Sequence, residues 1–178
     1  IISFLSIIIN FSQKFSSFTF LSKKEDVYVF AKELNNINKD LKLSLATTES
    51  GLVPYYSGIN TIDLFGINTK EFAKKPADGF LLLKSNFDII MINSSITGEN
   101  CNSLKNALDE SKNLSVKVAN RTDNWSDFNF KLLYGIDTSK YDSYFFPYPT
   151  NIFINKNSKA YKKISNSLKN TKASKCNF

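Results

Sequence analysis

The sequence contains no histidine among its 178 residues. This absence excludes Ser-His-Asp and Cys-His catalysis, metal sites built on histidine, and pH switching by an imidazole. The two cysteines, Cys101 and Cys176, are too few to form a zinc site by themselves. What is present, 42% hydrophobic and 14% aromatic residues, is enough for one folded domain and argues against disorder.

Arginine is almost absent, because Arg121 is the only one and lysine supplies the other 22 of 23 basic residues. Bidentate reading of bases depends on arginine, and no nucleic-acid-binding motif is found, so no nucleic acid is expected as a partner. The net charge of +7 lies entirely beyond Asp142, since residues 1–142 hold 16 basic and 16 acidic residues. The last seven lysines therefore indicate either contact with anionic lipid or polyprenyl phosphate, or simply a solvated helix face and tail.

The first nine residues are mostly apolar and do not begin with methionine. They are too few to span a bilayer, which needs about 20 residues, and no basic segment or small-residue cleavage site marks a signal peptide. Two interpretations remain: a buried element of a soluble domain, or the end of a transmembrane helix whose beginning has been cut away. Residues 10–24 are polar and rich in Ser and Phe, which indicates a connector.

From residue 25 onward, apolar periodicity predicts alternating helices and strands. Helical spacing predicts helices over 25–38, 99–111 and 158–170. Apolar runs or alternation predict the strands, of which 87–92 is the clearest, together with 43–47, 115–119, 128–134 and 151–155; a further apolar run covers 61–65. The stretches 51–58 and 144–149 are rich in Gly, Pro and aromatics and predict turns. This order favours an α/β fold with a small mixed sheet flanked by helices, either Rossmann-like or an α+β sandwich.

Two carboxylates, Glu49 and Asp63, lie at the ends of two apolar runs. If these runs are neighbouring strands, the carboxylates could converge where such sheets bind ligands. A pair about 5–9 Å apart in a cleft would allow acid–base hydrolysis as in glycosidases. The alternative is that both carboxylates accept backbone N–H groups and hold their turns. Asn68 is predicted to cap a short helix, with Glu71 three residues later.

Between these carboxylates lies a compact motif. Gly51 and Gly58 permit backbone angles that other residues resist, and Pro54 fixes a turn. Tyr55 and Tyr56 offer apolar rings with a polar rim, which suits a wet pocket or a membrane surface.

Residues 45–72 as a whole resemble a signature of bacterial membrane glycosyltransferases of the GT-C type, similar to protein mannosyltransferases and arabinofuranosyltransferases. Their C-terminal extracytoplasmic domain carries a strand, a Gly-x-x-Pro-Tyr-Tyr-Ser/Thr-Gly turn and an Ile-Asp-x-x-Gly-Leu-Asn/Thr-Asp segment. The matching positions are Gly51, Pro54, Tyr55, Tyr56, Gly58, Asp63, Gly66 and Asn68. Ile67 and Thr69 depart from the usual Leu and Asp, and Phe87-Asp88 stands where Pro-Asp is usual.

The resemblance implies a domain organisation. Residues 1–9 would be the end of a truncated transmembrane helix, 10–24 a connector, 25–170 a single extracytoplasmic α/β domain and 171–178 a flexible tail. The parent enzyme would lie in the bacterial inner membrane, with this domain on the periplasmic or extracytoplasmic side. It would transfer a sugar from a polyprenyl-phosphate donor to a glycan, lipid or protein acceptor.

The resemblance also implies that this domain is not catalytic, because the family's catalytic acid lies in an early loop that this chain does not contain. No catalytic residue, metal ligand or cofactor is therefore expected, and the domain would assist the binding of acceptor or lipid-linked donor. The expected binding residues are Glu49, Tyr55, Tyr56, Asp63 and Asn68, and the expected turn-forming residues are Gly51, Pro54, Gly58 and Gly66.

Two other functions stay open on the residues alone. The chain could be a free-standing ligand-binding or interaction module that uses the Tyr55-Tyr56 turn, or a small enzyme that uses Glu49 and Asp63. The pairing of Cys101 with Cys176 also stays open, since an oxidising compartment would favour it and a mobile tail around Cys176 would not.

Overall fold

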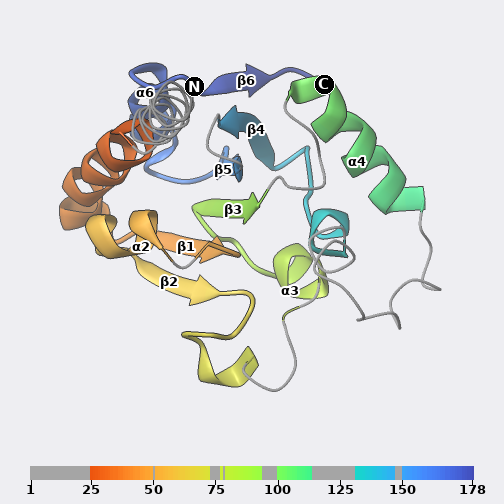
Figure 1. Cartoon of the computed structure of the whole chain (residues 1–178), viewed down its shortest axis with the longest axis horizontal. Coiled ribbons are helices and arrows are strands. Elements are labelled where there is room, and N and C mark those ends of the chain that lie inside the picture. The colour runs from red at the N-terminus through yellow and green to blue at the C-terminus, as the bar shows by residue number, and fades with distance from the viewer. Residues whose placement is uncertain are drawn as a thin grey trace, which may run out of the picture.

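The centre of the computed structural model, which describes residues 25–49, 51–72, 77, 79–93, 100–113, 131–146 and 150–178, is one six-stranded sheet (Figure 1). The strand order is β2-β1-β3-β5-β4-β6. The strands are β1 (Ser44–Thr47), β2 (Asn60–Asp63), β3 (Ile89–Asn93), β4 (Tyr141–Phe146), β5 (Thr150–Asn155) and β6 (Ser174–Cys176). The first three run parallel to one another, and β5, β4 and β6 each pair antiparallel with their neighbour. The expected mixed sheet of the α/β class is confirmed.

Helices cover both faces of this sheet. One face carries the helix over residues 25–41, α2 (Leu52–Ser57) and α6 (Tyr161–Lys169), and the other carries α3 (Gly79–Lys84), α4 (Cys101–Asn113) and a short helix over 131–134 (Figure 1). A 3₁₀ turn, η1 (Lys70–Phe72), follows β2. Within these ranges, no helix combines the length and the apolar character needed to cross a membrane.

Strand β3 joins the two apolar layers. Its residues Ile89 to Ile92 are at most 4% exposed. Because side chains alternate along a strand, Ile89 and Met91 pack with the helix over 25–41, whereas Ile90 and Ile92 pack with α3 and α4. This two-sided burial explains why β3 is the clearest strand in the sequence.

The connections among the first three strands create a topological switch point in the sheet. The chain leaves β1 through α2 on one face and returns from β2 through α3 on the other, so that β1 lies between β2 and β3. The chain direction across the sheet therefore reverses between β1 and β3. In doubly wound sheets, ligands bind outside the carboxyl ends of the strands at such a switch point.

Most predicted elements are confirmed with shifted ends, but the predicted turn over 51–58 is wrong because residues 52–57 form α2. Pro54 is the third residue of this helix, where the backbone N–H of an ordinary residue has no partner within the helix. Gly58 ends the helix at φ 60°, and its N–H donates to the carbonyl of Pro54. A left-handed residue at this position favours glycine.

Two further predictions are wrong for the described residues. The strand predicted over 128–134 is helical over 131–134, where the adjacent residues Leu132 and Leu133 are both buried, unlike the alternation of a half-exposed strand. The turn predicted over 144–149 is part of β4 up to Phe146, since the aromatic rings there pack on the sheet. The predicted strand 115–119 and the expectations for residues 1–9 and 10–24 lie outside the described residues.

The last strand lies where we expected a flexible tail over 171–178. Ser174–Cys176 forms the edge strand β6, which pairs with β4, and Cys176 is disulfide-bonded to Cys101 of α4. The Lys175 ammonium lies 2.6 Å from the Asp142 carboxylate, which also accepts a hydrogen bond from the Tyr161 hydroxyl. Burial opposes the ionisation of Asp142, but these two hydrogen bonds outweigh it and lower the pKa of the carboxyl below its usual value. The edge strand is thus held by pairing, charge and a covalent bond.

Two glycine backbones touch where α3 meets the short helix over 131–134. A Cβ atom on Gly135 would lie 2.1 Å from the carbonyl oxygen of Gly79, and one on Gly79 would lie 2.5 Å from the carbonyl oxygen of Lys131. Both glycines are buried, so the neighbouring backbone has no room to move aside.

We expect Gly135→Ala to lower the free energy of unfolding by about 1–3 kcal/mol, because the added methyl group overlaps backbone atoms. Urea denaturation followed by circular dichroism measures the change. Gly51→Ala is the matched control, since a Cβ there meets no atom within 4 Å. Equal stability of the two variants would contradict the close contact.

Candidate functional site

The carboxyl ends of β1 and β3 are joined by a set of polar contacts at the switch point. The Thr48 N–H donates to the Met91 carbonyl at 3.0 Å, and the Asn93 N–H donates to the Thr48 hydroxyl at 2.9 Å. The Glu49 N–H donates to the hydroxyl of Thr47 at 2.8 Å, and the Asn93 side-chain amide donates to the Glu49 carboxylate. These contacts fix the Glu49 backbone and side chain beside the end of β3.

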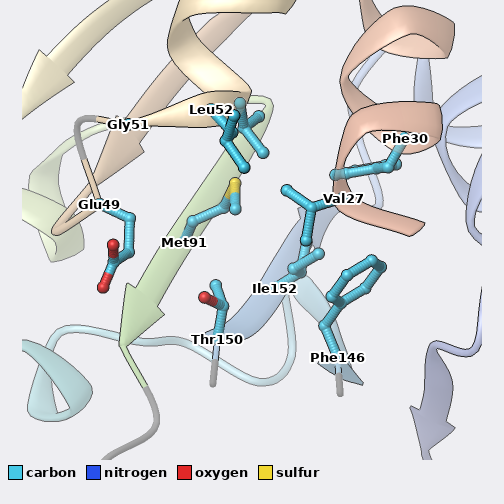
Figure 2. Close-up of a pocket in the computed structure, with 10 residues that line it drawn as sticks. Val27, Phe30, Glu49, Gly51, Leu52, Met91, Phe146, Thr150 and Ile152 are labelled. Carbon is cyan, nitrogen blue, oxygen red and sulfur yellow. The ribbon is translucent and has the colours of Figure 1, made fainter. Parts of the chain in front are cut away.

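A pocket of about 140 Å³ opens between this junction and the helix over 25–41 (Figure 2). Its walls are mostly apolar. The helix contributes Val27 and Phe30, β3 contributes Met91, and β4 and β5 contribute Phe146 and Ile152. These five side chains belong to one apolar layer of the fold. The pocket is therefore a gap in the layer between the helix and the sheet.

Two polar side chains also line this pocket, Glu49 and Thr150. Thr150 pairs with Asn93 across β3 and β5, so its side chain is on the same face as Met91 and Ile152. It is 2% exposed, and its hydroxyl oxygen has no hydrogen-bond partner among the described residues. Figure 2 shows this oxygen on the side of Thr150 that is nearer to Glu49. A buried hydroxyl without a partner is costly, and a ligand could satisfy it.

Asp63, the second predicted carboxylate, holds a turn and does not line this pocket. It is 2% exposed, and its carboxylate accepts the N–H of Phe65 at 3.0 Å and the N–H of Asn68 at 2.9 Å. Its own N–H donates to the Thr69 hydroxyl at 2.8 Å. The geometry of Asp63 is therefore that of the turn-holding alternative, while Glu49 faces the pocket alone.

The remaining residues of the motif shape this turn or lie on the surface. Gly66 has φ 82° and donates its N–H to the Asp63 carbonyl. Gly51 has φ −88° and ψ −120°, which is outside the left-handed region that Gly58 and Gly66 occupy. Asn68 is exposed, and the 3₁₀ turn begins after it, where the Phe72 N–H donates to the Thr69 carbonyl.

Tyr55 and Tyr56 form a surface cluster with Tyr28 of the helix over 25–41. The Tyr56 ring meets Tyr55 and Tyr28 edge-on, with ring centroids 4.9 and 4.8 Å apart. The Lys32 ammonium lies 5.4 and 5.5 Å from the ring centroids of Tyr28 and Tyr56, within the range of cation–π attraction. Tyr55 itself is 79% exposed. This cluster, Tyr28-Lys32-Tyr55-Tyr56, is outside the pocket and open to solvent.

The lysines beyond Asp142 are partly neutralised by aspartates. Lys156 and Lys175 both contact Asp142, Lys163 contacts Asp40, and Lys172 contacts Asp26, with nitrogen–oxygen distances of 2.6 to 4.0 Å. An exposed pair such as Lys163 with Asp40 contributes little to stability, but all four pairs reduce the positive potential available to a lipid surface.

Sequence reasoning found Glu49 but missed Asn93, Thr150 and the apolar wall. Asn93 is the last residue of β3 and directly follows the predicted strand 87–92, and a polar residue at the end of a strand beside β1 is a signal for the switch point. Thr150 carries no such signal, because its position depends on the antiparallel pairing of β5 with β3. Within the described ranges, His, Cys, Asp and Glu side chains form no group of three that could hold a metal ion.

Comparison with known proteins identifies the family. Residues 25–161 match the family described as Domain of unknown function (DUF8728), and the chain belongs to that family. No curated protein matches the chain, and neither does any solved structure.

The different contacts of the two carboxylates predict different effects on stability. Asp63→Asn places an amide N–H₂ group against a backbone N–H, and we expect a loss of about 1–3 kcal/mol in the free energy of unfolding. Glu49→Gln keeps an oxygen for the Asn93 amide, so we expect a loss below about 1 kcal/mol. Urea denaturation of both variants tests this order, and a Glu49→Gln variant less stable than Asp63→Asn would contradict it.

Proposed function

We propose that this member of the DUF8728 family is the non-catalytic, extracytoplasmic C-terminal domain of a polytopic membrane glycosyltransferase. The parent enzyme transfers a sugar from a polyprenyl-phosphate donor to a glycan, lipid or protein acceptor. This domain binds part of the acceptor or the donor in the pocket beside Glu49. The sequence resemblance over residues 45–72 supports the class of enzyme, and the site geometry supports a binding role for the domain.

The division of roles between Glu49 and Asp63 carries the proposal. Hydrolysis of a glycosidic bond needs two carboxylates facing one substrate. Here the Asp63 oxygens accept two backbone N–H groups inside a turn, whereas Glu49 lines an apolar pocket. A single carboxylate on an otherwise apolar wall suits binding and orientation of a ligand, because ligand pockets combine apolar walls with a few polar groups.

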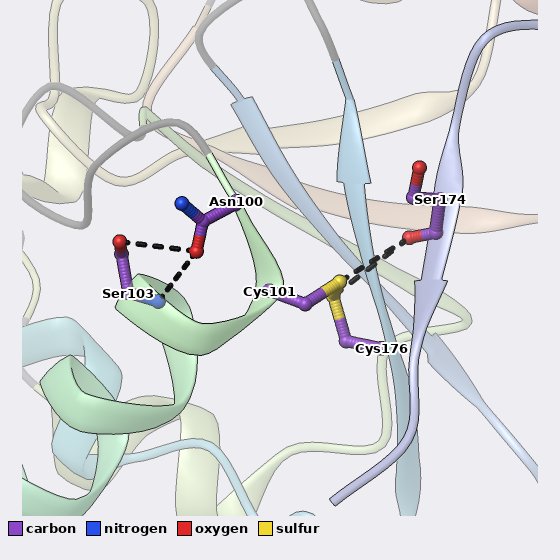
Figure 3. The surroundings of a disulfide bond; sticks show 5 residues. All are labelled: Asn100, Cys101, Ser103, Ser174 and Cys176. Carbon is purple, nitrogen blue, oxygen red and sulfur yellow. Dashed lines mark hydrogen bonds between the residues drawn. A yellow bond between two sulfur atoms is a disulfide. The ribbon is translucent and has the colours of Figure 1, made fainter.

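The disulfide supports the extracytoplasmic location. Cys101 begins α4 and Cys176 ends β6, 75 positions later, and Figure 3 shows the bond between the helix and the edge strand. The start of α4 is fixed by Asn100, whose side-chain oxygen accepts the N–H of Ser103 at 3.0 Å and its hydroxyl at 3.2 Å. Disulfides persist mainly outside the reducing cytosol.

A free-standing binding module is the second candidate function, favoured by the Tyr28-Lys32-Tyr55-Tyr56 cluster. An exposed aromatic group with a cation beside it is a common feature of binding surfaces. The two candidate functions differ in whether the whole gene product catalyses sugar transfer, and the sugar-transfer experiment described next distinguishes them.

The transfer experiment uses membranes from cells that express the whole gene, with labelled sugars supplied on polyprenyl-phosphate carriers. We expect transfer of label, and we expect Glu49→Gln to raise KM about tenfold with kcat within a factor of two. A hydrogen bond to a charged group contributes about 1.5–3 kcal/mol, so its loss weakens binding by at least that factor. Initial rates over a range of acceptor or donor concentrations provide both constants.

Glu110→Gln on the exposed face of α4 is the matched control and should leave both constants unchanged. A loss of kcat at unchanged KM in Glu49→Gln would make Glu49 catalytic and contradict the proposed role. Absence of transfer from every polyprenyl-phosphate sugar would contradict the proposed class of enzyme.

The disulfide gives a separate prediction. Cys101→Ser with Cys176→Ser should lower the free energy of unfolding by about 2–4 kcal/mol, because a long loop is no longer closed in the unfolded chain. Urea denaturation of the double variant should coincide with that of the reduced natural protein. Maleimide labelling of both cysteines in protein taken directly from cells would contradict the oxidised state.

A further inference from the structure

The pocket beside Glu49 combines an apolar interior with two polar groups of defined chemistry. From this combination we infer that it binds the short aliphatic segment and adjoining hydroxyl group of a neutral amphiphile, and that it excludes phosphate. The inference rests on the proposed function and makes it more specific, because it assigns the pocket to the acceptor and not to the polyprenyl-phosphate donor.

The size of the pocket limits the aliphatic part of the ligand. Its volume is about 140 Å³. An apolar cavity of about 150 Å³ holds one benzene molecule, so this pocket takes roughly six carbon atoms. The interior surface comes from Val27, Phe30, Met91 and Ile152, which offer no hydrogen bond to a sugar ring. An alkyl segment therefore fits better than a pyranose.

The polar groups match a hydroxyl. Glu49 accepts one hydrogen bond from the Asn93 amide, and a carboxylate has further lone pairs for a ligand O–H. Thr150 is 2% exposed, and its hydroxyl has no partner among the described residues. A ligand hydroxyl can donate to Glu49, and the Thr150 hydroxyl can donate to an oxygen of the same ligand. Such a ligand would satisfy the buried Thr150 hydroxyl, for which the described part of the chain provides no partner.

The charge of Glu49 acts against a phosphate group. None of the salt bridges among the described residues involves Glu49, so its negative charge is not neutralised by a lysine there. A phosphate group in this partly apolar pocket would be repelled by the Glu49 carboxylate, and the repulsion is stronger there than in water because the effective dielectric constant is lower. Where lysines beyond Asp142 form salt bridges among the described residues, their partners are Asp26, Asp40 and Asp142.

Met91 provides a direct probe, because it is the single methionine of the sequence and lines the pocket. The full chain is labelled with ¹³C at the methionine methyl group, and Met91→Leu identifies the Met91 signal in the NMR spectrum. The ligands are hexyl β-glucoside, hexyl phosphate and glucose. We expect hexyl β-glucoside to shift the signal in a saturable way, hexyl phosphate to bind at least tenfold more weakly, and glucose to cause no shift.

Glu49→Gln tests the origin of the selectivity. We expect the ratio of the two affinities to fall below threefold in this variant, while Glu110→Gln keeps the ratio of the natural chain. The methyl spectrum itself reports whether each variant is folded. Equal binding of hexyl phosphate and hexyl β-glucoside by the natural chain, an unchanged ratio in Glu49→Gln, or no saturable shift with any of the alkyl ligands would each overturn the inference.

The outcome is separate from that of the transfer experiment. Sugar transfer without a selective Met91 response would overturn the pocket assignment and leave the glycosyltransferase proposal standing. A selective response without sugar transfer would support the pocket chemistry and contradict the class of enzyme.

Discussion

The pairing of β3 with both β1 and β5 is the constraint on which the rest of the structure depends. β3 pairs parallel with β1 and antiparallel with β5, and it is the only described strand that joins the parallel to the antiparallel part of the sheet. Its alternating side chains serve both apolar layers. A shift of the β3 register by one residue would exchange the faces on which Met91 and Ile90 lie, and it would disrupt both apolar layers. The same register places Asn93 opposite Thr150, so the switch-point pocket is a product of the pairing that holds the core.

The sequence was sufficient for those elements whose pattern is local. The run Phe87 to Ile92 predicts a buried strand, and the helical spacing of Val27, Phe30 and Leu34 predicts the helix that covers it. It failed where tertiary contacts decide the local structure. Pro54 and the flanking glycines indicate a turn, yet a helix of six residues forms there because Val53 and Ser57 are buried against the sheet.

The candidate site was predictable to a similar extent. Glu49 follows a predicted strand, and its position at a strand end was sufficient to single it out. Asp63 has the same local signature but the opposite role, because the residues after it fold back so that the Phe65 and Asn68 N–H groups reach its carboxylate. The sequence cannot distinguish the role of Glu49 from that of Asp63, because the difference lies in the path that the backbone takes after each carboxylate. The partner of Glu49 across the pocket, Thr150, comes from a strand about 100 positions away and is brought there by antiparallel pairing.

The bond between Cys101 and Cys176 has a mechanical consequence. β6 has only three residues and lies at the edge of the sheet, where pairing on one side alone would let a pull on the last residues peel it away. Because Cys176 is joined to the first residue of α4, such a force passes into a helix of 13 residues packed on the sheet. The bond also closes a covalent ring from 101 to 176, so a single cut by a protease inside that ring leaves the two fragments attached to each other.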